Sequence, residues 1–305
     1  MQAELAGALA ALEPVLGSAG SDPQPLDGGI TNRNFRLRIG GEDVVVRLPG
    51  KDTELLGIDR AAERDATEAA ARAGVGPEVV AFLAEPPCLV TRFIPGRPLA
   101  AKELRAAGVL EQVAAALRAV HAGPPLPSRF DAFAIVDAYH ATAVARGARI
   151  PARYGELIAG AHAIRAALTG SEHAPVPCHD DLLTANFLHD GEHVRIVDWE
   201  YAGMGDRYFD LGNLSVNNGF AEADDERLLT AYWSAPCTPR RFAALRLMRI
   251  MSDFREGMWG VVQTAISALD FDFAAYAHEH LSRVAAGLAD PRFPTWLEDA
   301  RGDRS

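Results

Sequence analysis

The stretch from residue 176 to residue 203, VPCHDDLLTANFLHDGEHVRIVDWEYAG, carries a dense set of acids and other polar groups. Within it, Asp190-Gly191 lies between two short apolar runs, which is a strong signal for a hairpin. A two-residue loop would pair position 189 with 192, and a four-residue loop would pair 189 with 194. Either register returns Asp198 to the end of the hairpin where Asp181 and Asn186 lie. The sequence therefore predicts that these three side chains converge.

A carboxylate beside two oxygen ligands suits phosphoryl transfer, because a base must accept a hydroxyl proton while Mg²⁺ is held on the phosphates. The spacing from His179 through Asp181 to Asn186, followed by an Asp on the next strand, matches the catalytic set of protein kinases. We expect Asp181 to be the base, and Asn186 and Asp198 to be the metal ligands. His179 is expected to organise the loop by hydrogen bonds. Two other interpretations of this acidic stretch stay open. It could be a hairpin whose acids face solvent, or a divalent-metal hydrolase site.

A kinase also needs a phosphate-binding segment, and the chain has no Walker A sequence. Gly28 and Gly29 precede a predicted strand, with Thr31 and Asn32 beside them. Backbone amides and small polar side chains in such a segment could approach phosphates. An ordinary turn that enters the strand is the alternative explanation.

A cation for the phosphates is predicted at Arg47. The two lysines of the chain, Lys51 and Lys102, both lie outside the strand VVVRL, whereas Arg47 lies within it. Its guanidinium can project from one face of the strand and bind phosphate oxygens through two parallel hydrogen bonds. Glu63, on the following helix, could orient Arg47 by an ion pair, and a solvated helix face is the alternative for this residue.

The elements that must position these residues are a small sheet followed by helices. Alternation over residues 29–49 around Gly40-Gly41 predicts a hairpin, and short apolar runs predict strands over 78–83 and 88–94. An Ala-rich helix is predicted from Thr53 to Gly76. Further helices are predicted around 110–120 and over about 132–147, 153–169, 221–233, 240–267 and 272–288, before a polar tail from Pro291. We therefore expect an α+β chain with two lobes, an N-terminal nucleotide-binding lobe (1–94) and a catalytic and acceptor-binding lobe (95–305).

Composition limits the class of protein. The chain has 305 residues, 49% of them hydrophobic, and a formal net charge of -11 that argues against nucleic acid and suits a cationic or metal-bound partner. Cys88, Cys178 and Cys237 are in no metal-ligand spacing, so free thiols in a cytoplasmic protein are expected. The first residues fit an amphipathic helix better than a signal peptide, and no apolar run is long enough to span a bilayer.

Seven segments, in this order, resemble the choline and ethanolamine kinase branch of the aminoglycoside-phosphotransferase-like kinases: GGITNRNFRL, VVVRLPG, IDRAAE, GVGP, CHDDLLTANFL, IVDWEYAG and FDLGN. The resemblance runs from about residue 27 to 285 and implies a protein-kinase-like fold with ATP between the lobes. It assigns the same roles to Asp181, Asn186, Asp198 and Arg47. It also places Glu200 near the substrate and makes Asp210 structural. Trp-Glu after Asp198, and the lack of Ala-Pro-Glu, separate the chain from protein kinases.

The segment FREGMWGVVQTAISALDFDFAAYA resembles the helical region that supplies the aromatic box for the quaternary ammonium group in choline kinases. Trp259, Phe271 and Tyr276 match aromatic positions of that box, and Glu256 stands where the eukaryotic enzymes tend to place a second Trp. The resemblance implies a cage that is partly aromatic and partly acidic, in which Glu200 or Glu256 complements a cation. Core packing at helical spacing is the alternative for Trp259.

Together these features predict an ATP- and Mg²⁺-dependent kinase acting on choline, with ethanolamine next, and without nucleic-acid or membrane partners. An aminoglycoside, an amino sugar or thiamine stays open as acceptor, because acidic pockets suit all these cations. From a different class, a nucleotide-binding pseudokinase is the alternative, against which the intact set of Asp181, Asn186 and Asp198 counts. The oligomeric state stays open, including a homodimer, and adenine contacts are expected around Thr91 to Ile94.

Overall fold

The predicted hairpin forms the centre of a five-stranded antiparallel sheet in the computed structural model, which describes residues 2–26, 32–50 and 53–301. Gly40 and Gly41 make its turn with φ values of 59° and 89°, which glycine adopts without a steric cost. The strand order is β1-β2-β3-β5-β4. The strands are β1 (Gln24–Leu26), β2 (Asn32–Ile39), β3 (Glu42–Pro49), β4 (Val79–Leu83) and β5 (Cys88–Arg92).

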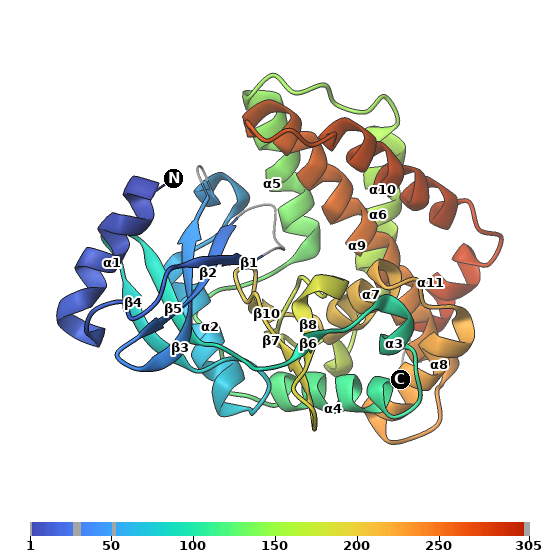
Figure 1. The fold of residues 1–305 in the computed structure, drawn as a ribbon. Coiled ribbons are helices and arrows are strands. Elements are labelled where there is room, and N and C mark those ends of the chain that lie inside the picture. Colours follow the sequence, from blue (N-terminus) through green and yellow to red (C-terminus); the bar gives the residue numbers. More distant parts are fainter. Residues whose placement is uncertain (1, 27–31, 51–52, 302–305) are drawn as a thin grey trace.

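The predicted N-terminal helix is confirmed as α1 (Gln2–Leu16). Ala8 and Leu12 are fully buried and belong to one apolar cluster with Val44 and Val46 of β3. Figure 1 shows α1 on the outer side of the sheet, away from the helical lobe. The small lobe therefore has a core of its own between α1 and the sheet.

The helix predicted from Thr53 to Gly76 is wrong at its beginning. Residues Thr53–Leu56 form a separate 3-10 turn, and Gly57 breaks the chain direction with a φ of 80°. The α-helix α2 (Arg60–Arg72) begins after Asp59, whose side chain accepts from the N–H groups of Ala61 and Ala62. This cap fixes the start of α2 and thereby places Arg60 and Glu63 on its first turn.

The rest of the chain is mostly helical, as predicted, and contains two small antiparallel sheets. One sheet pairs β7 (Val176–Cys178) with β10 (Gly203–Gly205), and the other has β6 (Arg97–Pro98), β8 (Phe187–His189) and β9 (Val194–Ile196). The helices are α3 (Ala101–Leu104), α4 (Val109–His121), α5 (Ala132–Ala145), α6 (Tyr154–Ala167), α7 (Arg207–Asn217), α8 (Glu222–Trp233), α9 (Pro239–Ile266), α10 (Phe273–Leu288) and α11 (Phe293–Arg301).

Three of these helices differ from the sequence predictions. The helices α3 and α7 were not predicted, and α11 forms within the tail that was expected to be polar. Trp296 explains why α11 forms, because its side chain is 5% exposed and belongs to the large core. Ala300 is also fully buried, and Phe293 and Leu297 pack against the same core, so apolar burial holds this helix in place.

The long helix α9 is the centre of the larger lobe, where it packs against α5, α7, α10 and α11. Although α9 has 28 residues, neither it nor any other helix in the described part of the chain is long and apolar enough to cross a membrane. Its buried side chains include the charged pair Arg255 and Glu256. The large core also takes in Ala66 and Ala70 of α2, so this helix joins the two lobes.

Candidate active site

The hairpin after the predicted base has the longer of the two loops that the sequence allows. β8 and β9 pair Phe187 with Ile196 and His189 with Val194, which leaves four residues in the loop. The N–H of residue 197 donates to the Asn186 carbonyl oxygen at 3.0 Å and extends this pairing by one step. The chain therefore brings position 198 back to the level of Asn186, as predicted.

The loop that carries Asp181 is fixed by buried hydrogen bonds. Asp210, on α7, accepts from the N–H groups of His179 at 2.9 Å and Asp180 at 2.7 Å. Burial lowers the pKa of His179, so its neutral ring donates from Nε2 to the Val197 carbonyl oxygen at 3.0 Å. Its Nδ1 accepts from the N–H of Asp181 at 3.2 Å. His179 thus organises the loop, and Asp210 holds its backbone N–H groups in place.

The ion pair predicted between Arg47 and Glu63 is present. Arg47 Nη1 lies 2.7 Å from Glu63 Oε1 and 2.5 Å from Asp198 Oδ1, and Arg47 Nε donates to Asn34 Oδ1 at 3.2 Å. Glu63 is 2% exposed, which rules out a solvated helix face for it. Burial opposes the charge of Arg47, but the carboxylates of Asp198 and Glu63 raise its pKa above the ordinary value. A permanent cation is therefore fixed where the two lobes meet.

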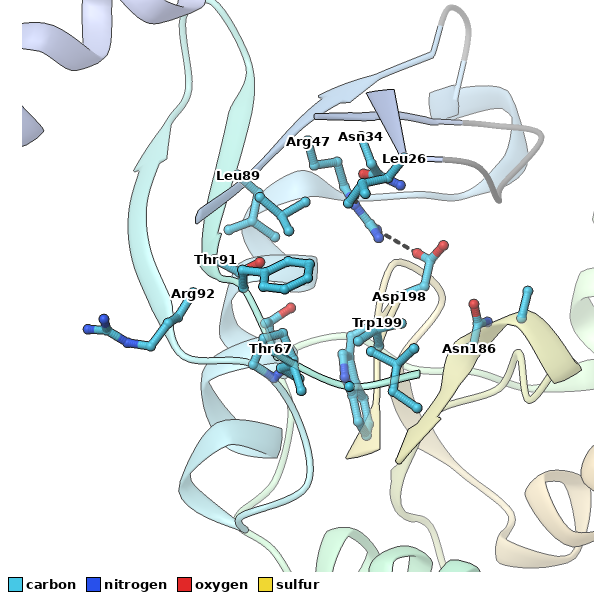
Figure 2. Close-up of a pocket in the computed structure, with 18 of the residues that line it drawn as sticks. Leu26, Asn34, Arg47, Thr67, Leu89, Thr91, Arg92, Asn186, Asp198 and Trp199 are labelled. Carbon is cyan, nitrogen blue, oxygen red and sulfur yellow. Dashed lines mark hydrogen bonds and ion pairs between the residues drawn. The ribbon is translucent and has the colours of Figure 1, made fainter. Parts of the chain in front are cut away.

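A cavity of about 310 Å³ opens between the sheet and the hairpin, within the size range of small-molecule sites. Leu89 of the sheet and Leu188 of the hairpin contribute to its lining, so both lobes form its walls. Residues 91–94, where adenine contacts were expected, line it as well. Figure 2 shows Arg47 reaching down from the sheet to Asp198, with the labelled apolar side chains beside them.

Asn186 and Asp198 line the same cavity, and their side-chain oxygens fit a Mg²⁺ ion. Asn186 Nδ2 donates to the Asp181 carbonyl oxygen at 2.8 Å, which fixes the orientation of the amide. Figure 2 shows the side chains of Asn186 and Asp198 on the hairpin side of the cavity. Amide and carboxylate oxygens are the hard ligands that Mg²⁺ prefers. The donor set therefore agrees with the predicted metal.

A second arginine, Arg60, links the Arg47 network to Glu200. Arg60 Nη1 lies 2.7 Å from Glu63 Oε2 and 3.0 Å from Glu200 Oε2. The sequence analysis missed Arg60, although it lies three residues before Glu63 in the segment IDRAAE. That spacing puts both residues on one face of a helix and was the signal that could have found it.

The predicted phosphate-binding segment is described only in part. Asn32, the first residue of β2, donates from Nδ2 to Glu200 Oε2 at 2.8 Å, so its side chain is bound to an acid of the other lobe. Gly28, Gly29 and Thr31 lie outside the described residues. Contact of this segment with phosphates stays a prediction.

An arginine that the sequence analysis did not single out lies beside the predicted base. Arg255, on α9, is 2% exposed, and its Nη1 lies 3.3 Å from Asp181 Oδ1. The same nitrogen donates to Glu256 Oε1, and the guanidinium lies over the Tyr201 ring, 4.2 Å from its centroid. Burial raises the pKa of Asp181 well above the ordinary value, although Arg255 acts in the opposite direction. Because Arg255 and Glu256 are both buried and in contact, they form a buried ion pair beside Asp181.

The predicted aromatic residues form one cluster, which also includes Phe273. The Trp259 ring makes edge contacts with Tyr276 and Phe273, at centroid distances of 5.6 Å and 5.7 Å, and Phe271 lies 6.0 Å from Tyr276. The Tyr276 hydroxyl donates to Glu256 Oε2 at 2.8 Å and so connects the cluster to the ion pair. Trp259 is 6% exposed, whereas Phe271 is 44% exposed. Trp259 is thus packed in the core, and its contact with an acceptor stays a prediction.

Two lobes with a polar loop and hairpin between them define a protein-kinase-like fold, in which the network of Arg47, Glu63 and Asp198 occupies the cleft. Comparison with known protein families identifies the chain within this class. The model of the phosphotransferase enzyme family matches residues 22–248, so the chain belongs to that family.

Relatives within this class confirm the resemblance found in the sequence. A solved structure of a choline/ethanolamine kinase family protein from Mesorhizobium loti is 33% identical, has a TM-score of 0.85, and aligns over 98% of this chain and 100% of its own. The choline kinase LicA from Streptococcus pneumoniae is 22% identical with a TM-score of 0.77, over 93% and 98% of the two chains, and shows the shared fold. Human ethanolamine kinase 2 is 32% identical over 36% of this chain and 34% of its own length. The chain thus matches about a third of that kinase.

Proposed function

We propose that the chain is an ATP- and Mg²⁺-dependent kinase that transfers a phosphoryl group to the hydroxyl of a small cationic alcohol, choline or ethanolamine. The observation that carries the proposal is Arg47, held by Glu63 and Asp198 at a cavity between the lobes. The names of the relatives support this acceptor class. In this proposal residues 1–94 are the nucleotide-binding lobe, and residues 95–305 are the catalytic and acceptor-binding lobe.

On the nucleotide side, the proposal places ATP in the cavity lined by residues 91–94 and Arg47. The planar guanidinium of Arg47 can form two parallel hydrogen bonds to phosphate oxygens, and Glu63 keeps it in that orientation. Asn186 and Asp198 would hold Mg²⁺, which when bound would neutralise negative charge on the phosphates. Gly28, Gly29 and Thr31 belong to the same proposal as phosphate contacts.

On the acceptor side, Asp181 accepts the proton of the acceptor hydroxyl. The hydroxyl oxygen then forms a bond to the γ-phosphorus, the bond from this phosphorus to the oxygen that bridges it to the β-phosphorus breaks, and ADP leaves. A positioned base of this kind contributes about 10² to 10⁴ in rate. Burial raises the pKa of Asp181, so its ionised form is a stronger proton acceptor than an exposed carboxylate, and Arg255 favours that ionised form. Glu200 and Glu256 supply negative charge on the acceptor side of the base.

Two properties of the whole chain agree with this proposal. The formal net charge of -11 suits a cationic acceptor. Cys88, Cys178 and Cys237 are free thiols, which is the usual state in the reducing cytoplasm that we propose as the location.

An acceptor screen coupled to ADP release tests the proposal. The panel contains choline, ethanolamine, an aminoglycoside, an amino sugar and thiamine, each with ATP and Mg²⁺. We expect acceptor-dependent ADP release with choline, ethanolamine or both. Release with one of the other cations alone would assign the chain to a different acceptor. Nucleotide binding without release for any acceptor would indicate a pseudokinase.

A further inference from the structure

The helix α9 carries two adjacent charged residues, Arg255 and Glu256, in the interior of the helical lobe. Arg255 is 2% exposed and Glu256 is 3% exposed. Buried charges are costly unless they are paired and hydrogen-bonded. Glu256 Oε1 accepts from Arg255, and its Oε2 accepts from the Tyr276 hydroxyl at 2.8 Å. The Glu256 carboxylate is therefore held from both sides in one orientation.

One guanidinium nitrogen connects this pair to the base. Arg255 Nη1 contacts Glu256 Oε1 and also lies 3.3 Å from Asp181 Oδ1. The plane of the guanidinium is supported by the Tyr201 ring, at 4.2 Å from its centroid. Arg255 thus sets the relative position of two carboxylates, because one of its nitrogens contacts an oxygen of each.

Carboxylates held in this way can distinguish two kinds of ammonium group. An ionised carboxylate can accept about four hydrogen bonds, so Glu256, with two partners, can accept more. A primary ammonium group has three N–H donors and can use these oxygens. A trimethylammonium group has no N–H donor, and its recognition depends on accessible aromatic faces.

In the described part of this site, the aromatic rings near Glu256 are engaged with other side chains. Trp259 is 6% exposed, and its ring is packed against Tyr276 and Phe273. Tyr276 also packs against the His280 ring at 4.4 Å and uses its hydroxyl on Glu256. Phe271 is the exposed member of the cluster. Because Glu256 is as buried as Trp259, the two differ in what each can still bind: the Glu256 carboxylate keeps lone pairs beyond its two hydrogen bonds, whereas the Trp259 ring is packed against neighbouring rings.

We propose that Arg255 is the residue that determines acceptor selectivity: by fixing Glu256 and Asp181 together, it favours an acceptor with a primary ammonium group over one with a trimethylammonium group. Arg255 acts through the two carboxylates, so it is a positioning residue. This inference rests on the proposed kinase activity toward a cationic alcohol.

The test compares kcat/KM for ethanolamine and choline in the wild-type chain and in Arg255→Met, which keeps an unbranched side chain and removes the charge and the donors. We expect the wild-type chain to prefer ethanolamine by about tenfold or more, the usual effect of one or two charge-assisted hydrogen bonds. In Arg255→Met this ratio should fall toward one, because Glu256 loses its fixed orientation. Arg255→Lys, which keeps the charge but not the planar fork, should restore part of the ratio.

Arg249→Met is the matched control. Arg249 lies on the same helix and pairs with Asp225 at 2.9 Å, away from Asp181, so its loss should lower the melting temperature and leave the ratio unchanged. If Arg255→Met is insoluble, Glu256→Gln carries the same test and should weaken ethanolamine use more than choline use.

A wild-type preference for choline would overturn the inference while leaving the kinase proposal intact. Equal losses for both acceptors in Arg255→Met, or in Glu256→Gln, would also overturn it, because Arg255 would then serve stability or the base alone. Failure of the wild-type chain to phosphorylate either acceptor would instead remove the proposed function, and this inference with it.

Discussion

The two sides of the proposed active site are built differently. On the nucleotide side, Arg47 and Asp198 line a cavity of about 310 Å³ that small molecules can enter. On the acceptor side, Arg255 and Glu256 are almost completely buried within the helical lobe. The nucleotide side is an open cavity between the lobes, whereas the acceptor side is a buried ion pair within the helical lobe. The nucleotide side should therefore tolerate changes in packing that the acceptor side does not.

The two sides are nevertheless connected by ion pairs. Asp198, Arg47, Glu63, Arg60 and Glu200 contact one another in that order, with distances of 2.5 to 3.0 Å. Among the acids in this series of ion pairs, we assign Glu200 to the acceptor and Asp198 to the metal. Substitutions on each side should show what that side contributes to nucleotide use and to acceptor use.

The largest effect is expected on the nucleotide side, from Asp198→Ala. One of two proposed protein ligands to Mg²⁺ and the partner of Arg47 are lost together, so turnover should become undetectable. The measurement is ADP release as a function of Mg²⁺ concentration. Glu192→Ala, at the exposed tip of the same hairpin, is the control and should behave as wild type. Wild-type activity with the usual Mg²⁺ requirement in Asp198→Ala would refute the ligand assignment.

On the acceptor side, Asp181→Asn should keep nucleotide binding and slow turnover by about 10² to 10⁴. The amide keeps the size of the side chain but cannot accept the hydroxyl proton. Nucleotide affinity by calorimetry and kcat by ADP release separate the two properties. Asp137→Asn, on the exposed surface of α5, should change neither. If Asp181→Asn turned over at the wild-type rate, Asp181 would not be the base.

A smaller effect is expected from Glu63→Gln, which removes the charge that Arg47 and Arg60 share. Loss of a hydrogen bond between charged groups costs about 1.5 kcal/mol, which corresponds to roughly tenfold. We expect this factor in the KM for ATP, with a smaller change in the KM for the acceptor. Glu68→Gln, on the solvent side of the same helix, is the control. Equal changes in both KM values would mean that Glu63 serves the two sides alike.

The smallest effect concerns Asp180, which is 0% exposed and has a φ of 67° beside the base. Burial, together with the charge of Asp210, raises its pKa well above the ordinary value. Between the ordinary Asp pKa of about 4 and the raised value, the folded chain therefore binds more protons than the unfolded chain. Wild-type stability should accordingly decrease with rising pH in this window, by at most about 1.4 kcal/mol per pH unit.

Asp180→Asn lacks this contribution, because an amide does not titrate. The melting temperature of the variant relative to wild type should therefore increase from pH 5 to pH 8, whereas Asp22→Asn at an exposed site should show no such trend. A pH-independent difference for Asp180→Asn would show that its carboxyl group is ionised in the folded protein.

The sequence predicted the nucleotide side better than the acceptor side, and the reason is physical. Asn186 and Asp198 lie on one hairpin just after the loop of Asp181, so local pairing rules are enough to bring them together. The pairing of Arg47 with Glu63 follows from a strand face and the next helix. The overall two-lobe fold could be predicted for the same reason, because hairpins and helical periodicity are local patterns.

The acceptor side depends on contacts that no local pattern contains. Asp181 and Arg255 are 74 positions apart, and the sequence of α9 does not say which of its faces meets the base. An Arg-Glu pair in a helix usually faces solvent, so its burial could not be inferred from spacing. The exposure of Trp259 could not be inferred either, because a core position and a cage wall have the same periodicity.

The structure of a complex with a non-hydrolysable ATP analogue, Mg²⁺ and ethanolamine tests the central claim most directly. We predict the phosphates beside Arg47, the metal on Asn186 and Asp198, and the acceptor hydroxyl within hydrogen-bond distance of Asp181. We also predict the ammonium group within hydrogen-bond distance of the Glu256 carboxylate. A nucleotide bound away from Arg47, or an acceptor hydroxyl out of reach of Asp181, would contradict the account.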